Sequence, residues 1–261
     1  MIRDEIRVIP VPFSDEIVPG DDLVKKLEVA LHHHRLSLLD RDILVIKHKI
    51  VSKAEGQIVH LSNVNPSRAA KAWAQKCGAD ARLVEVALRQ SKRVVRKQIL
   101  GKNKAQKRSV LITETGHGLV CANSGVDASN VDGGNCALLL PKDPDRSATR
   151  LRSQIKNTLG AAVAVIISDS FGRPWREGLT EVAIGVAGMK PLLDYRGQRD
   201  PHGYQLHASY EAIADELACA AGLICGKLKR TPVCIVRGFK YQPGRGTARD
   251  LIRSKATDLF R

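Results

Sequence analysis

The carboxylate of Asp169 and the hydroxyl of Ser170 are the side chains of this sequence best arranged to do chemistry together. They end the apolar run AVAVIISDS and precede the turn residues Gly172 and Pro174. A carboxylate and a hydroxyl that leave a rigid strand are held firmly, and hard divalent cations prefer such oxygen ligands. The pattern predicts a cation site at a strand end, although an aspartate that only starts a turn gives the same pattern.

A second oxygen-rich segment, NSGVDASNV, contains Asp127 and Asn130. If this segment meets the first one, Asp127 and Asp169 share metal ions that bridge nucleotide phosphates, as in phosphoryl-transfer sites. The sequence leaves open whether the two segments meet. An Asx-type turn explains Asp127 and Asn130 equally well.

Lys49 and Lys53 follow an apolar run in the string KIVSKAEG, where we expect a strand that enters a loop. Lysine binds phosphate through its point charge, so this pair could contact a nucleotide, or the two side chains could simply be exposed to solvent. The basic segment GFKYQPGRGTARD offers Gly244 and Gly246, whose backbone N–H groups could approach a phosphate. It lacks the spacing of a Walker loop, and G-x-G-x-x-G does not occur in the chain.

His117 lies between two glycines at a predicted hairpin turn. It is a candidate acid, base or ligand, and a histidine packed on its neighbours is the alternative. G-x-S-x-G is absent, which argues against a serine hydrolase.

The chain carries 42 Lys and Arg against 27 Asp and Glu, a net charge of +15. Such an excess indicates an anionic partner: nucleic acid, nucleotide phosphate or an acidic substrate. The most basic window is 89–108, where nine of twenty residues are Lys or Arg. It contains no aromatic residue for base stacking, so a solvated surface or a site for polyphosphate or polycarboxylate is favoured over nucleic acid.

The composition, 261 residues with 43% hydrophobic and 26% charged, is that of a globular protein with a packed core. The six cysteines form no C-x-x-C pair, so we expect buried thiols in a reducing compartment and neither a zinc finger nor a disulfide framework. Acidic residues near the N-terminus argue against a signal peptide, and no apolar stretch is long enough to span a bilayer. We expect a cytoplasmic protein without membrane contact.

Hydrophobic periodicity predicts alternating strands and helices. The predicted helices cover about 22–33, two segments within 66–98, about 145–159 and about 210–228; the predicted strands include the N-terminal IRVIPVPF, a pair joined at 116–118, the run at 161–170 and PVCIVRGF. This alternation, with hairpins among it, predicts a mixed α+β fold more than a regular doubly wound sheet.

Five strings in this order, KIVSKAEG, ETGHGLVCANSGVDASNV, LLLPKDPDRSA, ISDSFGRPWREG and VAIGVAGMKPLLDYRG, closely resemble the coenzyme F420-0:L-glutamate ligase family. The resemblance covers nearly the whole chain. It implies a GTP-dependent ligase that adds L-glutamate to coenzyme F420-0, giving F420-1 and further γ-linked glutamates. The implied route passes through an acyl phosphate and releases GDP and phosphate.

The resemblance also implies the site and the partners. The catalytic residues would be Asp127 and Asp169, and the ligands of Mg²⁺ or Mn²⁺, two ions, would be Asp127, Asp169 and Ser170. K⁺ is a further implied cation and GTP the co-substrate. The nucleotide-binding residues would be Lys49, Lys53, Asn130, Ser14, Asp15, Glu16, Ile17, Gly244 and Gly246.

The expected fold is one ligase unit over residues 1–261, a discontinuous larger domain with a smaller inserted one, in an intertwined homodimer. Three positions depart from the family's common pattern: His48 replaces a glutamine, Ser124 an alanine and Ser170 a threonine. Two alternatives remain. A flavin-dependent oxidoreductase would need a further domain for which 261 residues leave no room, and a basic nucleic-acid or nucleotide-binding protein without ligase activity depends on charge alone.

Overall fold

The structure, a computed structural model, describes residues 5–100, 108–128 and 134–258. Its helices are α1 (Leu23–His33), α2 (His48–Ala54), α3 (Arg68–Cys77), α4 (Ala81–Arg89), α5 (Pro144–Leu159) and α6 (Ile213–Cys225). Its strands are β1 (Arg7–Val11), β2 (Ile43–Lys47), β3 (Ile58–His60), β4 (Ser91–Leu100), β5 (Arg108–Thr115), β6 (Val120–Ala122), β7 (Cys136–Leu138), β8 (Ala164–Arg173), β9 (Arg176–Ala187), β10 (Leu193–Asp194), β11 (Tyr210–Glu211) and β12 (Val233–Arg237). The mixed α+β prediction is confirmed.

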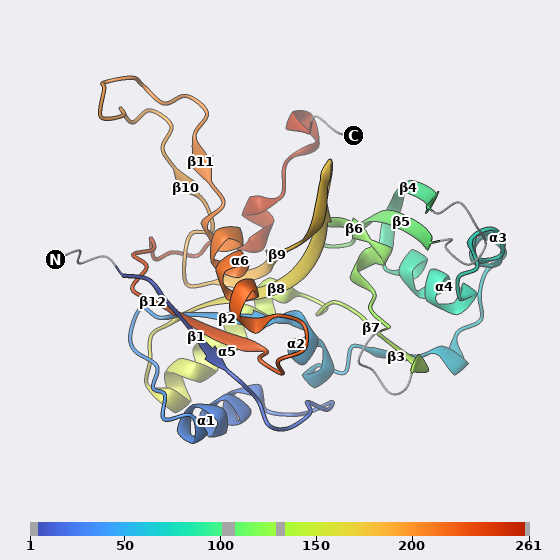
Figure 1. The fold of residues 1–261 in the computed structure, drawn as a ribbon, viewed down its shortest axis with the longest axis horizontal. Coiled ribbons are helices and arrows are strands. Elements are labelled where there is room, and N and C mark those ends of the chain that lie inside the picture. Colours follow the sequence, from blue (N-terminus) through green and yellow to red (C-terminus); the bar gives the residue numbers. More distant parts are fainter. Residues whose placement is uncertain (1–4, 101–107, 129–133, 259–261) are drawn as a thin grey trace.

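The central sheet has the strand order β1-β12-β2-β8-β9 (Figure 1). The pair β2 and β8 is parallel, and its neighbours are antiparallel. β2 and the apolar first part of β8, up to Ile167, are buried because helices cover both faces of the sheet. Lys47 ends β2 and lies in register with Ser168, the first polar residue of β8.

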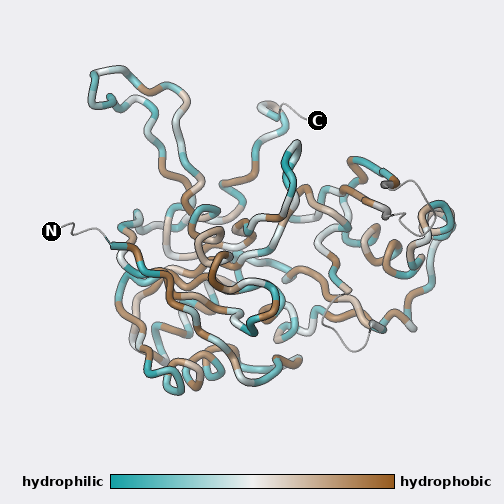
Figure 2. Tube along the Cα trace, viewed as in Figure 1, coloured by the Kyte–Doolittle hydropathy of each residue, from teal (hydrophilic) through white to brown (hydrophobic). Residues whose placement is uncertain are grey.

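Side-chain alternation divides the core between the two faces of this sheet. Leu44, Ile46 and Ile167 pack with α1 and α5, whereas Val45 and Ile166 pack with α6. The apolar residues follow the central strands, and the projecting β10–β11 hairpin is mostly hydrophilic (Figure 2). Successive side chains of β8 therefore point to opposite faces of the sheet, and this alternation also separates the polar residues later in the strand.

Polar residues and a glycine cap the ends of α1 and α5. Asp22 accepts hydrogen bonds from the backbone of Val24 and Lys25, and Asp143 caps α5 ahead of a proline. Gly160 ends α5 in the left-handed region, with φ of 72°. Local signals therefore account for these boundaries.

The chain from β3 to β7 forms a group of its own beside the central sheet (Figure 1). It contains α3 and α4, the pair β3–β7 and the sheet β4-β5-β6. The strand pair joined at 116–118 is thus confirmed as β5 and β6. The division into two domains and the intertwined homodimer stay predictions.

Three sequence-based expectations are corrected. Lys49 and Lys53 lie on α2 and not on a loop. The second predicted helix within 66–98 ends at Arg89, and the basic residues that follow form β4, where cross-strand pairing with β5 overrides the helical spacing. Asp169 and Ser170 do not end a strand, because β8 continues to Arg173 and pairs with β9 beyond them.

Part of the basic window is engaged within the protein. The Arg93 guanidinium lies 2.6 Å from a carboxylate oxygen of Glu114, and the Lys97 ammonium lies over the Trp73 ring. Residues 101–107 of this window lie outside the described residues.

The thiols fit the sequence-based prediction. All six cysteines are free, and only Cys219 is more than slightly exposed. Burial and the nearby Asp169 charge raise the pKa of Cys121 to about 12, so this thiol is protonated at neutral pH. In the described part of the chain, no helix is long and apolar enough to cross a membrane.

Glu85 of α4 offers a test of electrostatic stabilisation. Its carboxylate accepts hydrogen bonds from the Ser67 backbone at 2.9 Å and from Arg89 at 2.8 Å. Hydrogen bonding by the Ser67 side chain, together with these two bonds, lowers the pKa of Glu85 from 4.5 to about 2. Because the folded-state pKa lies below the unfolded value, the stabilisation is present above pH 4.5 and is lost as the pH falls toward 2. We expect Glu85→Gln to lower the free energy of unfolding by about 2 kcal/mol at pH 7.

Urea unfolding at several pH values measures this effect. The difference between Glu85→Gln and the wild type should shrink as the pH falls from 4.5 toward 2. Glu28→Gln, at an exposed position on α1, is the control and should leave stability unchanged at every pH. A pH-independent difference at Glu85 would contradict the electrostatic origin.

Candidate functional site

A cavity of about 740 Å³ lies where β2 and β8 reach their polar residues. Its wall is formed by the segment 13–17, the end of β2, α2, the middle of β8, Glu181 of β9 and the loop 225–232 after α6. Asp127 enters from the smaller group of elements. The structure thus brings together the two oxygen-rich segments that the sequence could not join.

Two consecutive residues of α2 contact the two predicted catalytic aspartates. The Lys49 ammonium lies 2.5 Å from the Asp127 carboxylate, and the His48 imidazole Nε2 lies 3.3 Å from Oδ1 of Asp169. His48 is buried, and its Nδ1 lies 3.3 Å from the Ser52 hydroxyl. The first turn of α2 therefore positions a cationic and a polar group against the two carboxylates.

Glu181 organises the opposite face of β8. It lies directly across from Ser170 in the β8–β9 register and accepts hydrogen bonds from the hydroxyls of Ser170 at 2.6 Å and Ser168 at 2.9 Å. The Lys47 ammonium lies 2.5 Å from the same carboxylate. Burial raises the pKa of Glu181, but the hydrogen bonds from Lys47, Ser170 and Ser168 lower it by more, so the net pKa lies below its ordinary value.

The cavity is rich in cationic side chains. Lys53 of α2 contacts Glu16 at 3.0 Å, and Lys227 of the loop after α6 donates a hydrogen bond to the Ser170 hydroxyl at 2.6 Å. Other cations on the wall are Lys47, Lys49, Lys229 and Arg230. This composition suits an anionic ligand with several phosphate or carboxylate oxygens.

The oxygen donors of this cavity fit a hard divalent cation. Asp127 and Asp169 supply two carboxylates to the cavity, and Ser170 supplies a hydroxyl on the opposite face of β8 from Asp169. Within the described residues, no group of three or more His, Cys, Asp or Glu side chains is close enough to hold a metal alone. Magnesium commonly takes one or two protein carboxylates and completes its shell with water and phosphate oxygens, so the set suits a cation bound together with a nucleotide.

Comparison with known proteins gives one consistent result. The family model of the F420-0:Gamma-glutamyl ligases matches residues 14–238, most of the chain. The chain belongs to this family. It is 42% identical to a coenzyme F420:L-glutamate ligase of Methanopyrus kandleri over 98% of both chains, and 40% identical to one of Methanocaldococcus jannaschii over the full length of both. A third relative of the same name, from Methanothermobacter thermautotrophicus, is 42% identical over 98% of this chain and 99% of its own.

Most of the residues expected for a ligase of this family line the one cavity. These are Lys49, Lys53, Asp15, Glu16, Ile17, Asp127, Asp169 and Ser170. Asn130 lies outside the described residues. The roles of these residues stay predictions, but their proximity is a structural fact.

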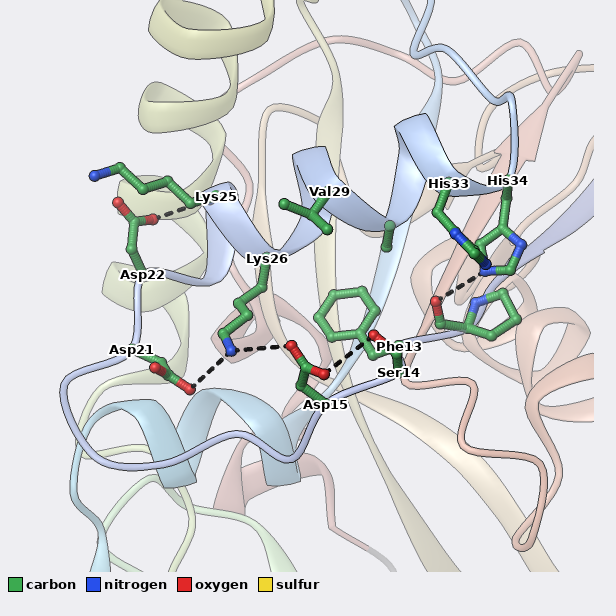
Figure 3. Close-up of a pocket in the computed structure, with 12 residues that line it drawn as sticks. Phe13, Ser14, Asp15, Asp21, Asp22, Lys25, Lys26, Val29, His33 and His34 are labelled. Carbon is green, nitrogen blue, oxygen red and sulfur yellow. Dashed lines mark hydrogen bonds and ion pairs between the residues drawn. The ribbon is translucent and has the colours of Figure 1, made fainter.

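Ser14 lies in a neighbouring groove of about 630 Å³ between the segment 12–15 and α1 (Figure 3). Asp15 lines both hollows and lies 3.5 Å from the Lys26 ammonium. At the end of the groove, the His34 ring lies 3.3 Å from the Pro12 carbonyl oxygen. Phe13 also lines both the groove and the main cavity.

Gly244 and Gly246 are not brought to the cavity. A Cβ on Gly246 would lie 2.5 Å from the Met189 carbonyl oxygen and 2.3 Å from the Pro191 side chain. Close packing against the segment after β9 therefore explains why position 246 is a glycine, and no bound phosphate is needed to explain it. His117 also lies elsewhere, with its Nε2 3.0 Å from the Lys142 carbonyl oxygen.

Sequence analysis missed Glu181, Lys47 and Lys227. A weak signal existed for the first two, since each is a charged residue adjoining an apolar run, in ILVIK and TEVAIGVA. No local pattern pointed to Lys227, which lies in a polar loop and reaches Ser170 only through the packing of α6 on the sheet.

Proposed function

We propose that this chain is a GTP-dependent ligase that joins L-glutamate to coenzyme F420-0. One observation supports this proposal most directly: Asp127, Asp169 and several lysines line one cavity. The chain that forms this cavity belongs to the ligase family. GTP, the phosphodiester of the coenzyme and the terminal carboxylate of the coenzyme are all anionic. The cationic side chains of the cavity suit such ligands.

The proposed reaction has two steps. An oxygen of the coenzyme's carboxylate attacks the γ-phosphorus of GTP, the bond to the β–γ bridging oxygen breaks, and GDP leaves with that electron pair. The glutamate nitrogen then attacks the acyl carbon of the resulting acyl phosphate and loses a proton, and inorganic phosphate leaves. Repetition at the new γ-carboxylate gives further γ-linked glutamates.

The residues predicted for the site have the following roles in this scheme. Lys49 and Lys53 bind phosphate oxygens from one face of α2, since residues four apart share a helix face. Asp127 and Asp169 hold Mg²⁺ or Mn²⁺, which when bound neutralises the charge on the phosphoryl oxygens. Asp15, Glu16 and Ile17, which line the main cavity, contact the nucleoside.

The proposal is tested by incubating the full chain with coenzyme F420-0, L-glutamate, GTP and Mn²⁺ in a potassium buffer. Mass spectrometry should show glutamyl adducts that appear together with GDP. The glutamyl adducts should be absent when GTP is omitted, and also when L-glutamine replaces L-glutamate. No adduct despite metal-dependent GTP binding would instead favour the nucleotide-binding alternative.

A further inference from the structure

Asp169 and Ser170 point to opposite faces of the central sheet. They are consecutive residues of β8, and side chains alternate along a strand. Asp169 contacts His48 on the α2 face, whereas Ser170 contacts Glu181 on the α6 face. One cation therefore cannot readily take both side chains as ligands, and a cation at Ser170 would be separate from one at Asp169.

The α6 face at Ser170 is already occupied by cationic groups. The Ser170 hydroxyl donates to Glu181 and accepts a hydrogen bond from the Lys227 ammonium at 2.6 Å. Lys47 lies 2.5 Å from the same glutamate. Gly222 of α6 makes this arrangement possible, since a Cβ there would lie 2.6 Å from Cγ of Glu181.

The charges on the two faces differ in sign. The Ser170 cluster, defined as Lys47, Ser168, Ser170, Glu181 and Lys227, contains two ammonium groups and one carboxylate. On the other face, Asp127 and Asp169 supply two carboxylates; the Lys49 ammonium contacts Asp127, and the His48 imidazole contacts Asp169. A divalent cation is attracted to the second face and repelled by the first.

We propose that the Lys227 ammonium takes the place of a second divalent cation beside Ser170, so that the site binds one divalent cation at Asp127 and Asp169. The inference rests on the proposed function, because it needs a cation and a nucleotide in this cavity. Lysine presents a compact positive charge with three donors, which suits the phosphate oxygens that a second ion would otherwise neutralise.

The test counts Mn²⁺ in the complex of the full chain with a non-hydrolysable GTP analogue. Equilibrium dialysis gives the numbers of Mn²⁺ and nucleotide bound per chain. Electron paramagnetic resonance adds a second readout, because two neighbouring Mn²⁺ ions couple and broaden the six-line spectrum of an isolated ion. We expect one Mn²⁺ per bound nucleotide and an uncoupled spectrum.

Three variants isolate the role of Lys227. Lys227→Glu removes the ammonium and adds a carboxylate, and should raise the count to two ions with a coupled spectrum. Lys229→Glu makes the same change of charge in the same cavity-lining loop and should leave the count at one. Lys227→Arg keeps the positive charge and should also leave it at one. Circular dichroism checks that each variant is folded.

The outcomes separate the inference from the proposed function. Two coupled ions in the wild type would overturn the inference while leaving the ligase proposal intact. A folded Lys227→Glu that still binds one ion would show that Lys227 does not exclude the second. Nucleotide binding with no Mn²⁺ in the wild type would overturn the metal role of Asp127 and Asp169, and the inference with it.

Discussion

Asp169→Asn is expected to lower the rate of glutamyl addition about a thousandfold. A bound cation contributes several kcal/mol to stabilising the phosphoryl transition state, and each 1.4 kcal/mol corresponds to about a tenfold change in rate. Asparagine keeps the size of the side chain and an oxygen that His48 can reach, but it removes the negative charge. The loss should therefore appear in kcat, while the fold is kept.

Initial rates of GDP release and of adduct formation measure this effect, and thermal unfolding checks that the fold is intact. Asp194→Asn, at an exposed position on β10 and outside the cavity lining, is the matched control and should retain wild-type rates. A rate for Asp169→Asn within tenfold of the wild type would remove Asp169 from the proposed catalytic role.

Glu181→Gln is expected to destabilise the folded chain by about 3 kcal/mol, the range for breaking a buried ion pair from one side. The amide offers a single acceptor oxygen, whereas the carboxylate accepts from Lys47, Ser168 and Ser170. Turned one way, its NH₂ group faces the Lys47 ammonium, which cannot accept a hydrogen bond; turned the other way, it faces the Ser168 hydroxyl, which must then give up its own donation to the side chain. Lys47, mostly buried, also loses its counter-charge.

Urea unfolding at pH 7 measures the loss, with Glu177→Gln, an exposed position on the same strand, as the control that should change stability by less than about 0.5 kcal/mol. The folded-state pKa of Glu181 lies below its ordinary 4.5, so its contribution should be present above that pH and decline as the pH falls through it. Equal stability of Glu181→Gln and the wild type would mean that water satisfies Lys47 and the two serines in the absence of the carboxylate.

Much of the fold follows from local sequence signals. The run AVAVIIS predicted a buried strand, and helices do cover both faces of β8 along that run. A helix start was also predicted near residue 22, where the Asp22 carboxylate accepts hydrogen bonds from free backbone N–H groups of α1. The expectations that failed did so where pairing between distant segments decides. Residues 91–98 have helical spacing, yet they pair with β5.

The sequence by itself determined the family of this protein, its candidate aspartates and lysines, and the excess of positive charge. Only the tertiary structure decided how these groups combine. It placed Lys49 and Lys53 on a helix, set Asp127 opposite Lys49, and directed Asp169 and Ser170 to opposite faces of one sheet. Glu181 and Lys227 joined the site through strand register and the packing of α6, which no local pattern encodes because both depend on contacts between residues far apart in the chain.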